Sequence, residues 1–425
     1  MPPDRQVRNT AETVARRSYG KLIAFLAART RDVAGAEDAL SDAFAAALAD
    51  WPTSGIPARP EAWLMTVARR KLIDAARRRR SSEDATGHLR LMAEELEAAA
   101  TGDADISDER LRLMFACAHP CLDAGVRAPL ILQTILGFDA ATIASAFLIS
   151  PATMGQRLVR AKAKIRLAGI PFRVPERGDL PERLDAVLEA IYAAFAEGWG
   201  TDIRRRNLAE EAIWLGRLVQ SLLPDEPEAL GLLALMLHSE ARRGARRNGL
   251  GEYVPLTDQD PALWDASLIE EAEALLSRAN RVGITGRYQL EAAVQSAHSV
   301  RRFTGRSDWA AIEQLYDALL ALTGSPVVAI NRAVAIAETK GAAAGLAALD
   351  ALSGDGRLAE YQPYWAACAG LQSRTGDITA AGHAYQRAIG LETDPAARAF
   401  LQQRWHELSG RRARSRYDPA TEHKS

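Results

Sequence analysis

The chain has few of the features that mark secreted or membrane proteins. Cysteine occurs only three times in 425 residues, and so low and odd a count excludes the disulfide framework of a small secreted domain. No apolar run approaches the roughly 18 residues that a membrane-spanning helix needs. The N-terminal segment also lacks the apolar stretch of a signal peptide. These absences predict a cytoplasmic protein with no membrane partner.

An excess of charge of one sign is lacking as well. The 53 Lys and Arg residues nearly balance the 54 Asp and Glu residues, for a net charge of −1. Any binding to nucleic acid must therefore come from local basic patches. The sequence contains no P-loop, GxSxG or HExxH motif. We therefore expect neither an enzyme nor a cofactor.

The segment CAHPC offers three possible metal ligands, which are Cys117, His119 and Cys121. No nearby CxxC pair or second histidine completes a zinc site. We expect core thiols beside a helix-ending His-Pro, and metal or redox sensing is the alternative.

Long β-branched runs and period-two alternation are missing, whereas Ala and Leu abound and Gly or Pro recur at intervals suited to helix ends. This pattern predicts an all-α protein, and the length predicts more than one domain. Charge then divides the first part of the chain. Residues 69–80 hold seven cations and one acid, and residues 81–110 are strongly acidic. The acidic segment has the character of a linker between two basic modules.

Residues 126–168 have the pattern of a helix-turn-helix. An apolar helix should end at Gly137, a short helix should begin after Asp139, and a second should begin after Ser150, which is a good N-cap followed by Pro. Between residues 148 and 166 there are five cations and no acid, which suits a recognition helix in a DNA major groove. A solvated basic face is the alternative. The expected buried stripe consists of Met154, Leu158, Ala161 and Ile165.

Two amphipathic helices are expected upstream. Residues 60–80, PEAWLMTVARRKLIDAARRRR, combine an aromatic residue with cations, which suits stacking on unpaired bases and neutralising phosphates. Residues 36–51, AEDALSDAFAAALADW, form an acidic amphipathic helix. That helix is suited to docking on a protein, although an ordinary surface helix has the same pattern.

Taken in order, these segments resemble an extracytoplasmic-function (ECF) RNA polymerase sigma factor. The two upstream helices resemble region 2 of the family and residues 126–168 resemble region 4. The tail looks like the subgroup with a long tetratricopeptide-like C-terminal extension. The domains that this resemblance implies are 1–80 for region 2, 81–108 for the linker, 109–175 for region 4 and 176–425 for a helical regulatory domain.

The resemblance implies two partners, core RNA polymerase and promoter DNA. The β′ clamp helices would be contacted by Asp38, Leu40, Asp42 and Phe44. The −10 element would be contacted by Trp63, Arg69, Arg70, Lys71 and Arg77. The −35 element would be contacted by Thr153, Gln156, Arg157 and Arg160, with Lys162 and Lys164 on its backbone. Region 4 would also touch the β flap.

The tail carries one fair tetratricopeptide-like repeat and a degraded second one over residues 326–352. Because such repeats need stacked neighbours, nearby hairpins must complete the solenoid. We expect this domain to contact the sigma domains within the chain and to regulate them in place of a separate anti-sigma factor. A merely structural cap is the alternative. The repeat residues are Trp365, Ala369, Ala381, Tyr385 and Ala388.

A polar group in GRYQLEAAVQSAH forms either a ligand or peptide site or a contact that fixes hairpin packing. Its members are Arg287, Tyr288, Glu291 and His298. Two other classes of function stay open. A conventional helix-turn-helix regulator with a repeat-type sensor domain would leave the basic helix at 60–80 unexplained. An enzyme or scaffold built on the tail, with a vestigial DNA module, ranks third.

Overall fold

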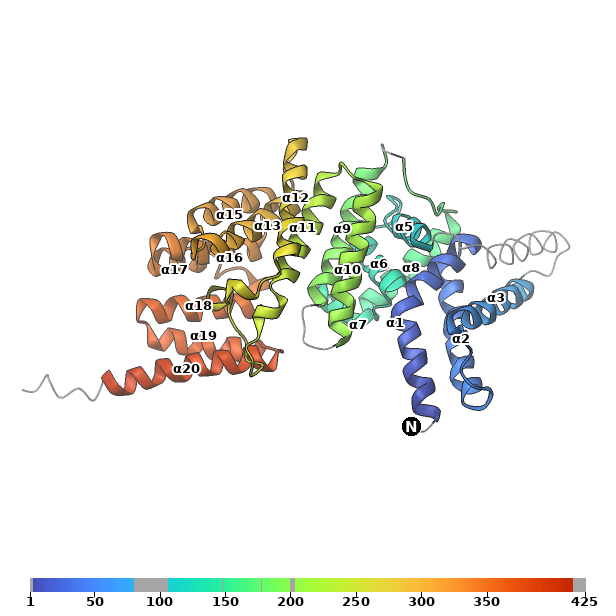
Figure 1. The fold of residues 1–425 in the computed structure, drawn as a ribbon, viewed down its shortest axis with the longest axis horizontal. Coiled ribbons are helices and arrows are strands. Elements are labelled where there is room, and N and C mark those ends of the chain that lie inside the picture. Colours follow the sequence, from blue (N-terminus) through green and yellow to red (C-terminus); the bar gives the residue numbers. More distant parts are fainter. Residues whose placement is uncertain (1–2, 80–105, 148, 177, 199–202, 416–425) are drawn as a thin grey trace, which may run out of the picture. The chain divides into compact units, whose positions relative to one another are not determined.

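A computed structural model describes residues 3–79, 106–147, 149–176, 178–198 and 203–415 (Figure 1). Within these ranges the chain is helical, and its β-structure is limited to an isolated bridge between Arg247 and Tyr253. The predicted all-α fold is confirmed. None of the described helices has the length and apolar character that crossing a membrane requires. Most of the predicted acidic linker lies outside the described residues.

The helices divide between two compact units, residues 1–218 (unit 1) and residues 219–425 (unit 2). Unit 1 contains α1 (Pro3–Thr30), α2 (Val33–Ser54), α3 (Pro60–Arg79), α5 (Ile106–Cys117), α6 (Ala124–Leu136), α7 (Ala140–Ala146), α8 (Pro151–Leu167), α9 (Leu180–Glu197) and most of α10 (Ile203–Leu222). Unit 2 contains α11 (Pro227–Ala241), α12 (Ala266–Val282), α13 (Arg287–Ser299), α14 (Arg301–Thr304), α15 (Trp309–Thr323), α16 (Pro326–Lys340), α17 (Ala342–Asp350), α18 (Gln362–Thr375), α19 (Ile378–Leu391) and α20 (Pro395–Ser415).

The first three helices pack around α2, which contacts both α1 and α3. Helix α2 begins after Asp32, whose carboxylate accepts a hydrogen bond from the Gly35 backbone N–H at 3.0 Å. Its buried side is largely alanine, so neighbouring helices can approach it closely. Leu40 and Trp51 fill the remaining space and are almost fully buried. Burying such a side chain contributes about 1.5–3 kcal/mol.

The helices of the predicted regions 2 and 4 are packed against each other through α1 and α6. At Gly20 of α1 the two backbones come so close that a Cβ atom would lie 1.9 Å from the carbonyl oxygen of Ile135. Any larger residue at position 20 would push α6 away. A glycine in the middle of α1 therefore permits the contact, although it weakens the helix itself.

Helix α9 packs on α6 and α5, so the chain beyond residue 175 continues into unit 1. Arg110 of α5 is almost fully buried, forms an ion pair with Glu211 and lies 4.6 Å from the ring centroid of Trp214. Helix α9 therefore packs directly on the first helix of the helix-turn-helix, and α10 contacts α5. The domain boundary predicted at residue 176 stays a prediction.

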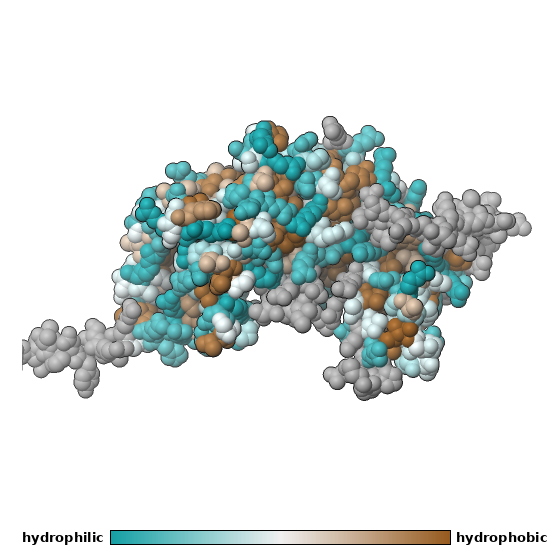
Figure 2. Space-filling view, viewed as in Figure 1, coloured by the Kyte–Doolittle hydropathy of each residue, from teal (hydrophilic) through white to brown (hydrophobic). Residues whose placement is uncertain are grey.

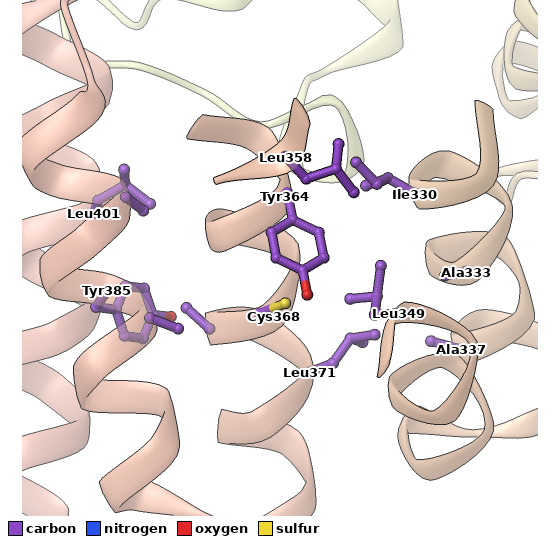
Figure 3. Packing of buried hydrophobic residues seen from close by; sticks show 13 residues of the cluster. Ile330, Ala333, Ala337, Leu349, Leu358, Tyr364, Cys368, Leu371, Tyr385 and Leu401 are labelled. Carbon is purple, nitrogen blue, oxygen red and sulfur yellow. The ribbon is translucent and has the colours of Figure 1, made fainter. Parts of the chain in front are cut away.

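In unit 2 the last five helices pack in sequence around one apolar cluster, shown in Figure 3. Tyr364 and Cys368 of α18 lie between Leu349 of α17 and Tyr385 of α19 (Figure 3). Two consecutive helix pairs, α16–α17 and α18–α19, thus share a core. The tetratricopeptide-like character of these pairs stays a prediction. The visible face carries hydrophilic side chains interrupted by separate hydrophobic patches (Figure 2).

Candidate nucleic-acid interface

The helix-turn-helix frame is formed by α6, α7 and α8, and its predicted ends are confirmed. Gly137 ends α6 in the left-handed conformation, with φ of 69°. Asp139 accepts a hydrogen bond from the Thr142 backbone N–H at 2.8 Å, and Ser150 accepts one from the Thr153 N–H at 3.2 Å. Both caps satisfy backbone donors that a helix N-terminus would otherwise leave unpaired.

Helix α8 has two distinct faces. The predicted stripe of Met154, Leu158, Ala161 and Ile165 is buried against the unit, which confirms it. The opposite face, here called the recognition face, is exposed. Its members are Thr153, Gln156, Arg157 and Arg160, all expected from the sequence at the −35 element. The structure therefore exposes two guanidinium groups, the Gln156 amide and the Thr153 hydroxyl on one face of α8, which carries no acid. The Thr153 hydroxyl lies 2.7 Å from the Ser150 hydroxyl.

Lys162 does not belong to the recognition face. Its side chain is buried, and its ammonium group forms an ion pair with Glu37 of α2. One turn later the guanidinium of Arg166 lies 3.5 Å from the carboxylate of Asp32. These two contacts attach α8 to the N-terminal half of α2. Lys162 stands four residues after Leu158, so helical spacing places it at the flank of the buried stripe, and that signal is visible in the sequence.

Lys164 remains exposed, and its ammonium group donates a hydrogen bond to the Cys121 carbonyl.

The possible metal ligands of the segment CAHPC do not face one another as a site. The Cys117 thiol is fully buried and lies 3.5 Å from the Thr134 hydroxyl. Burial raises the pKa of this thiol to about 12, so it is protonated at neutral pH, unlike a metal-bound thiolate. Nδ1 of His119 accepts a hydrogen bond from the Cys121 backbone N–H at 3.2 Å. The described residues hold no His, Cys, Asp or Glu cluster suited to a metal ion.

The predicted −10 residues on α3 lie in different surroundings. Trp63 is half-buried, and its ring centroid lies 5.4 Å from that of Trp51 in an edge-to-face arrangement. Arg69 is half-buried and turned towards Phe25, whose ring centroid lies 5.1 Å from its guanidinium carbon. Arg70 is exposed, and so is Lys71, which lies 3.5 Å from Asp42. The side chain of Arg77 lies outside the described part of the chain. Among the described cations predicted at the −10 element, Arg70 and Lys71 are therefore the exposed ones.

The predicted polymerase-binding residues of α2 are divided between surface and core. Asp38 and Asp42 are exposed, Phe44 is half-buried, and Leu40 is fully buried among the first three helices. Leu48 near the end of α2 is 46 % exposed. The exposed face of α2 is therefore acidic and carries one large apolar side chain, Leu48, whereas Leu40 belongs to the core beneath it.

Three of the four polar residues predicted in the tail lie together, and His298 lies apart from them. The guanidinium carbon of Arg287 lies 5.2 Å from the ring centroid of Tyr288. Arg287 and Glu291 make an ion pair at 2.7 Å, and the Tyr288 backbone N–H donates to the Glu228 carboxylate at 2.9 Å. His298 faces the interior, 3.5 Å from the Ser307 hydroxyl, with its ring edge on Trp309. Burial lowers the pKa of His298 to about 4, so the ring is neutral at physiological pH.

Gly155 stands within α8 with open space around its Cα, because a Cβ atom there would meet nothing within 4 Å. Replacing it by Ala is therefore expected to stabilise the helix by about 0.5–1 kcal/mol, the usual cost of glycine inside a helix. Thermal unfolding of the Gly155→Ala variant measures this gain. A lower melting temperature would contradict it. Lost promoter binding by the stabilised variant would show that DNA approaches the α8 backbone at this position.

Three family models match the chain. Residues 14–82 match "Sigma-70 region 2", residues 51–168 match "ECF sigma factor", and residues 183–280 match a family of unknown function, DUF6596. An uncharacterized protein of Rhizobium meliloti is 39 % identical over 383 residues, which cover 88 % of this chain and 90 % of that protein. No solved structure matches. The first two matches cover the second half of α1, then α2 and α3, and α6–α8, and these helices carry the surfaces described above.

Proposed function

The chain belongs to the ECF sigma factors of RNA polymerase, with a C-terminal extension, and from this premise we propose that unit 1 directs core polymerase to promoters with specific −10 and −35 elements. Sigma factors of this family act in transcription initiation by binding core polymerase and promoter DNA. The finer assignment of elements to surfaces rests on the geometry of α2, α3 and α8.

The recognition face of α8 is the observation that carries the proposal. Its exposed Arg157 and Arg160 are suited to guanine edges and phosphates, and Gln156 is suited to adenine. The polar start of α8 would enter the major groove first, as in other helix-turn-helix proteins. Lys164, whose side chain is exposed beyond this face, would then contact the DNA backbone.

Region 2 supplies the second pair of surfaces. The exposed Arg70 and Lys71 would neutralise phosphates of the −10 element, and the half-buried Trp63 would offer an aromatic edge to an unstacked base. The acidic face of α2, with Asp38 and Asp42, would dock on the β′ clamp helices, and region 4 would touch the β flap. Neither module needs high affinity alone, because the polymerase raises the effective concentration of both.

The C-terminal extension is proposed to regulate these surfaces from within the chain, in place of a separate anti-sigma factor. The packing of α9 on α6 supports this, because α6 is the supporting helix of the helix-turn-helix. Arg127 of α6 reinforces the contact. Its guanidinium donates to the carbonyls of Pro120 and Leu122 and, at 3.4 Å, to that of Glu182 in α9. A change in the extension would thus be transmitted to the frame that holds α8.

The test is run-off transcription from a promoter library with core polymerase, comparing the full chain with a chain that ends at residue 222. Ending at residue 222 keeps α9 and α10, whereas ending at 175 would uncover the apolar side of α6. Promoter-specific transcripts from either chain support the sigma role, and their ratio shows whether the extension activates or inhibits. Equal output from both chains, with equal affinity for polymerase, would refute regulation. Duplex binding without polymerase-dependent initiation would favour a conventional regulator.

A further inference from the structure

Unit 2 contains a buried guanidinium that forms no ion pair with any carboxylate of the described residues. Arg242, the residue that ends α11, is 7 % exposed. The described residues place no acid within ion-pair distance of it, and the hydrogen bond of its side chain runs from Nη2 to the neutral Gln295 amide oxygen. Its Nη1 is buried and has no hydrogen-bond partner. A buried charge in a native protein is normally paired, since leaving it alone is costly.

The groups around Arg242 do not compensate this charge. Arg246 acts on it as a second cation, and burial lowers the pKa of Arg242 to about 10, so it stays positive at neutral pH. The interior histidines nearby, His238 and His298, have pKa values lowered by burial to about 3 and about 4, and are neutral. Positive charge at Arg242 therefore has no counterion from the described chain.

Two polar side chains from other helices lie near the Arg242 guanidinium. Tyr316 of α15 is close enough to interact electrostatically with Arg242, and burial raises the pKa of its hydroxyl to about 12, so it keeps its proton. Gln295 of α13 is half-buried and is thus in contact with solvent on one side. Displacement of the Gln295 amide frees Nη2 for another acceptor.

We propose that Arg242 is the centre of a binding site for a small oxyanion, a carboxylate or phosphate group of a small molecule, which displaces the Gln295 amide. The oxyanion accepts hydrogen bonds from Nη1 and Nη2 of Arg242 in the two-point geometry that guanidinium groups provide, with the Tyr316 hydroxyl as a further donor. The site is centred on Arg242, which was not expected from the sequence, and lies at the junction of α11, α13 and α15. Two residues of the group expected from the sequence are its neighbours, since His298 interacts electrostatically with Arg242 and Glu291 with Tyr316. It does not depend on the proposed role in transcription.

The experiment measures anion binding by the full chain without polymerase. Calorimetric titrations with inorganic phosphate, acetate and succinate are compared with chloride at equal ionic strength. We expect saturable binding of at least one oxyanion that Arg242→Met weakens about tenfold to a hundredfold, which is the effect of losing a charge-assisted hydrogen-bonded pair. Arg306→Met, which removes an exposed arginine of the same unit, is the matched control and should bind normally.

Two further measurements distinguish loss of the anion site from a folding defect in Arg242→Met. Arg242→Met should melt at a higher temperature than the wild type without anion, because it removes an unpaired buried charge. Gln295→Ala keeps the charge, removes the displaced group and should bind the anion severalfold more tightly. The preferred anion distinguishes a phosphate ligand from a carboxylate. The proposal is overturned by absence of saturable binding in the wild type, by equal affinity in Arg242→Met, or by weaker binding in Gln295→Ala.

Discussion

Replacing Arg157 and Arg160 together by Ala should reduce promoter-specific transcription by at least about thirtyfold, while leaving the protein folded. Each residue is exposed on the recognition face of α8, and neither contributes to the buried stripe. A base or phosphate contact by such a residue is worth about 1–3 kcal/mol, so two lost contacts give at least about 2 kcal/mol, or thirtyfold. Run-off transcription at a fixed salt concentration measures the loss.

Arg173→Ala is the matched control for this prediction, because Arg173 is exposed and lies beyond the end of α8. Its transcription should equal that of the wild type. The slope of log affinity for the promoter against log salt concentration should also decrease by about 1 for each residue of the pair that contacts a DNA phosphate. Normal transcription by the double variant would show that the recognition face does not contact the −35 element. Helix α8 would then be an ordinary solvated basic helix.

Local features of the helix-turn-helix could be predicted from the sequence because they depend on nearby residues. The caps at Asp139 and Ser150 bond to backbone groups three residues away, and the stripe of α8 follows from helical spacing. The all-α fold followed from composition for a similar reason. Such features need no knowledge of what the helix packs against.

The partners of single charged residues could not be predicted in the same way. Lys162 pairs with Glu37, which lies 125 residues away in the chain, and this pairing depends on how α8 meets α2. Leu40 looks like part of a docking stripe, but packing of α1 and α3 against α2 buries it completely. Arg242 directly follows the last residue of α11, and the packing of unit 2 buries it.

Replacing Lys162 by Met should lower the free energy of unfolding of unit 1 by about 2–4 kcal/mol. The substitution leaves the Glu37 carboxylate in a site where its side chain is only 17 % exposed. Removing one partner of a buried ion pair costs about 3–5 kcal/mol when burial is complete, and the remaining exposure of Glu37 reduces that cost. Hydrogen exchange of the α2 and α8 amides measures the loss at the contact itself.

The pH dependence of this loss has a definite sign. Burial already raises the pKa of Glu37, and Lys162 acts in the opposite direction. Without Lys162 the folded-state pKa rises further, so the folded chain holds a proton that the unfolded chain has released. The destabilisation by Lys162→Met should therefore be small near pH 4, where the carboxyl is largely protonated in both states, and should grow as pH rises. A cost that is independent of pH would contradict this account.

The exposed pair of Lys71 and Asp42 supplies the matched control, because its side chains are 45 % and 60 % exposed. Lys71→Met should change stability by no more than about 0.5 kcal/mol. Glu37→Met combined with Lys162→Met should recover most of the stability, since an apolar pair of similar volume replaces a buried ion pair at little cost.

The same double variant also tests the contact with the DNA backbone that the sequence predicts for Lys162. A stable double variant that transcribes normally shows that Lys162 serves only to attach α8 to α2. A stable double variant with reduced transcription shows that Lys162 leaves Glu37 for a phosphate when region 4 binds promoter DNA.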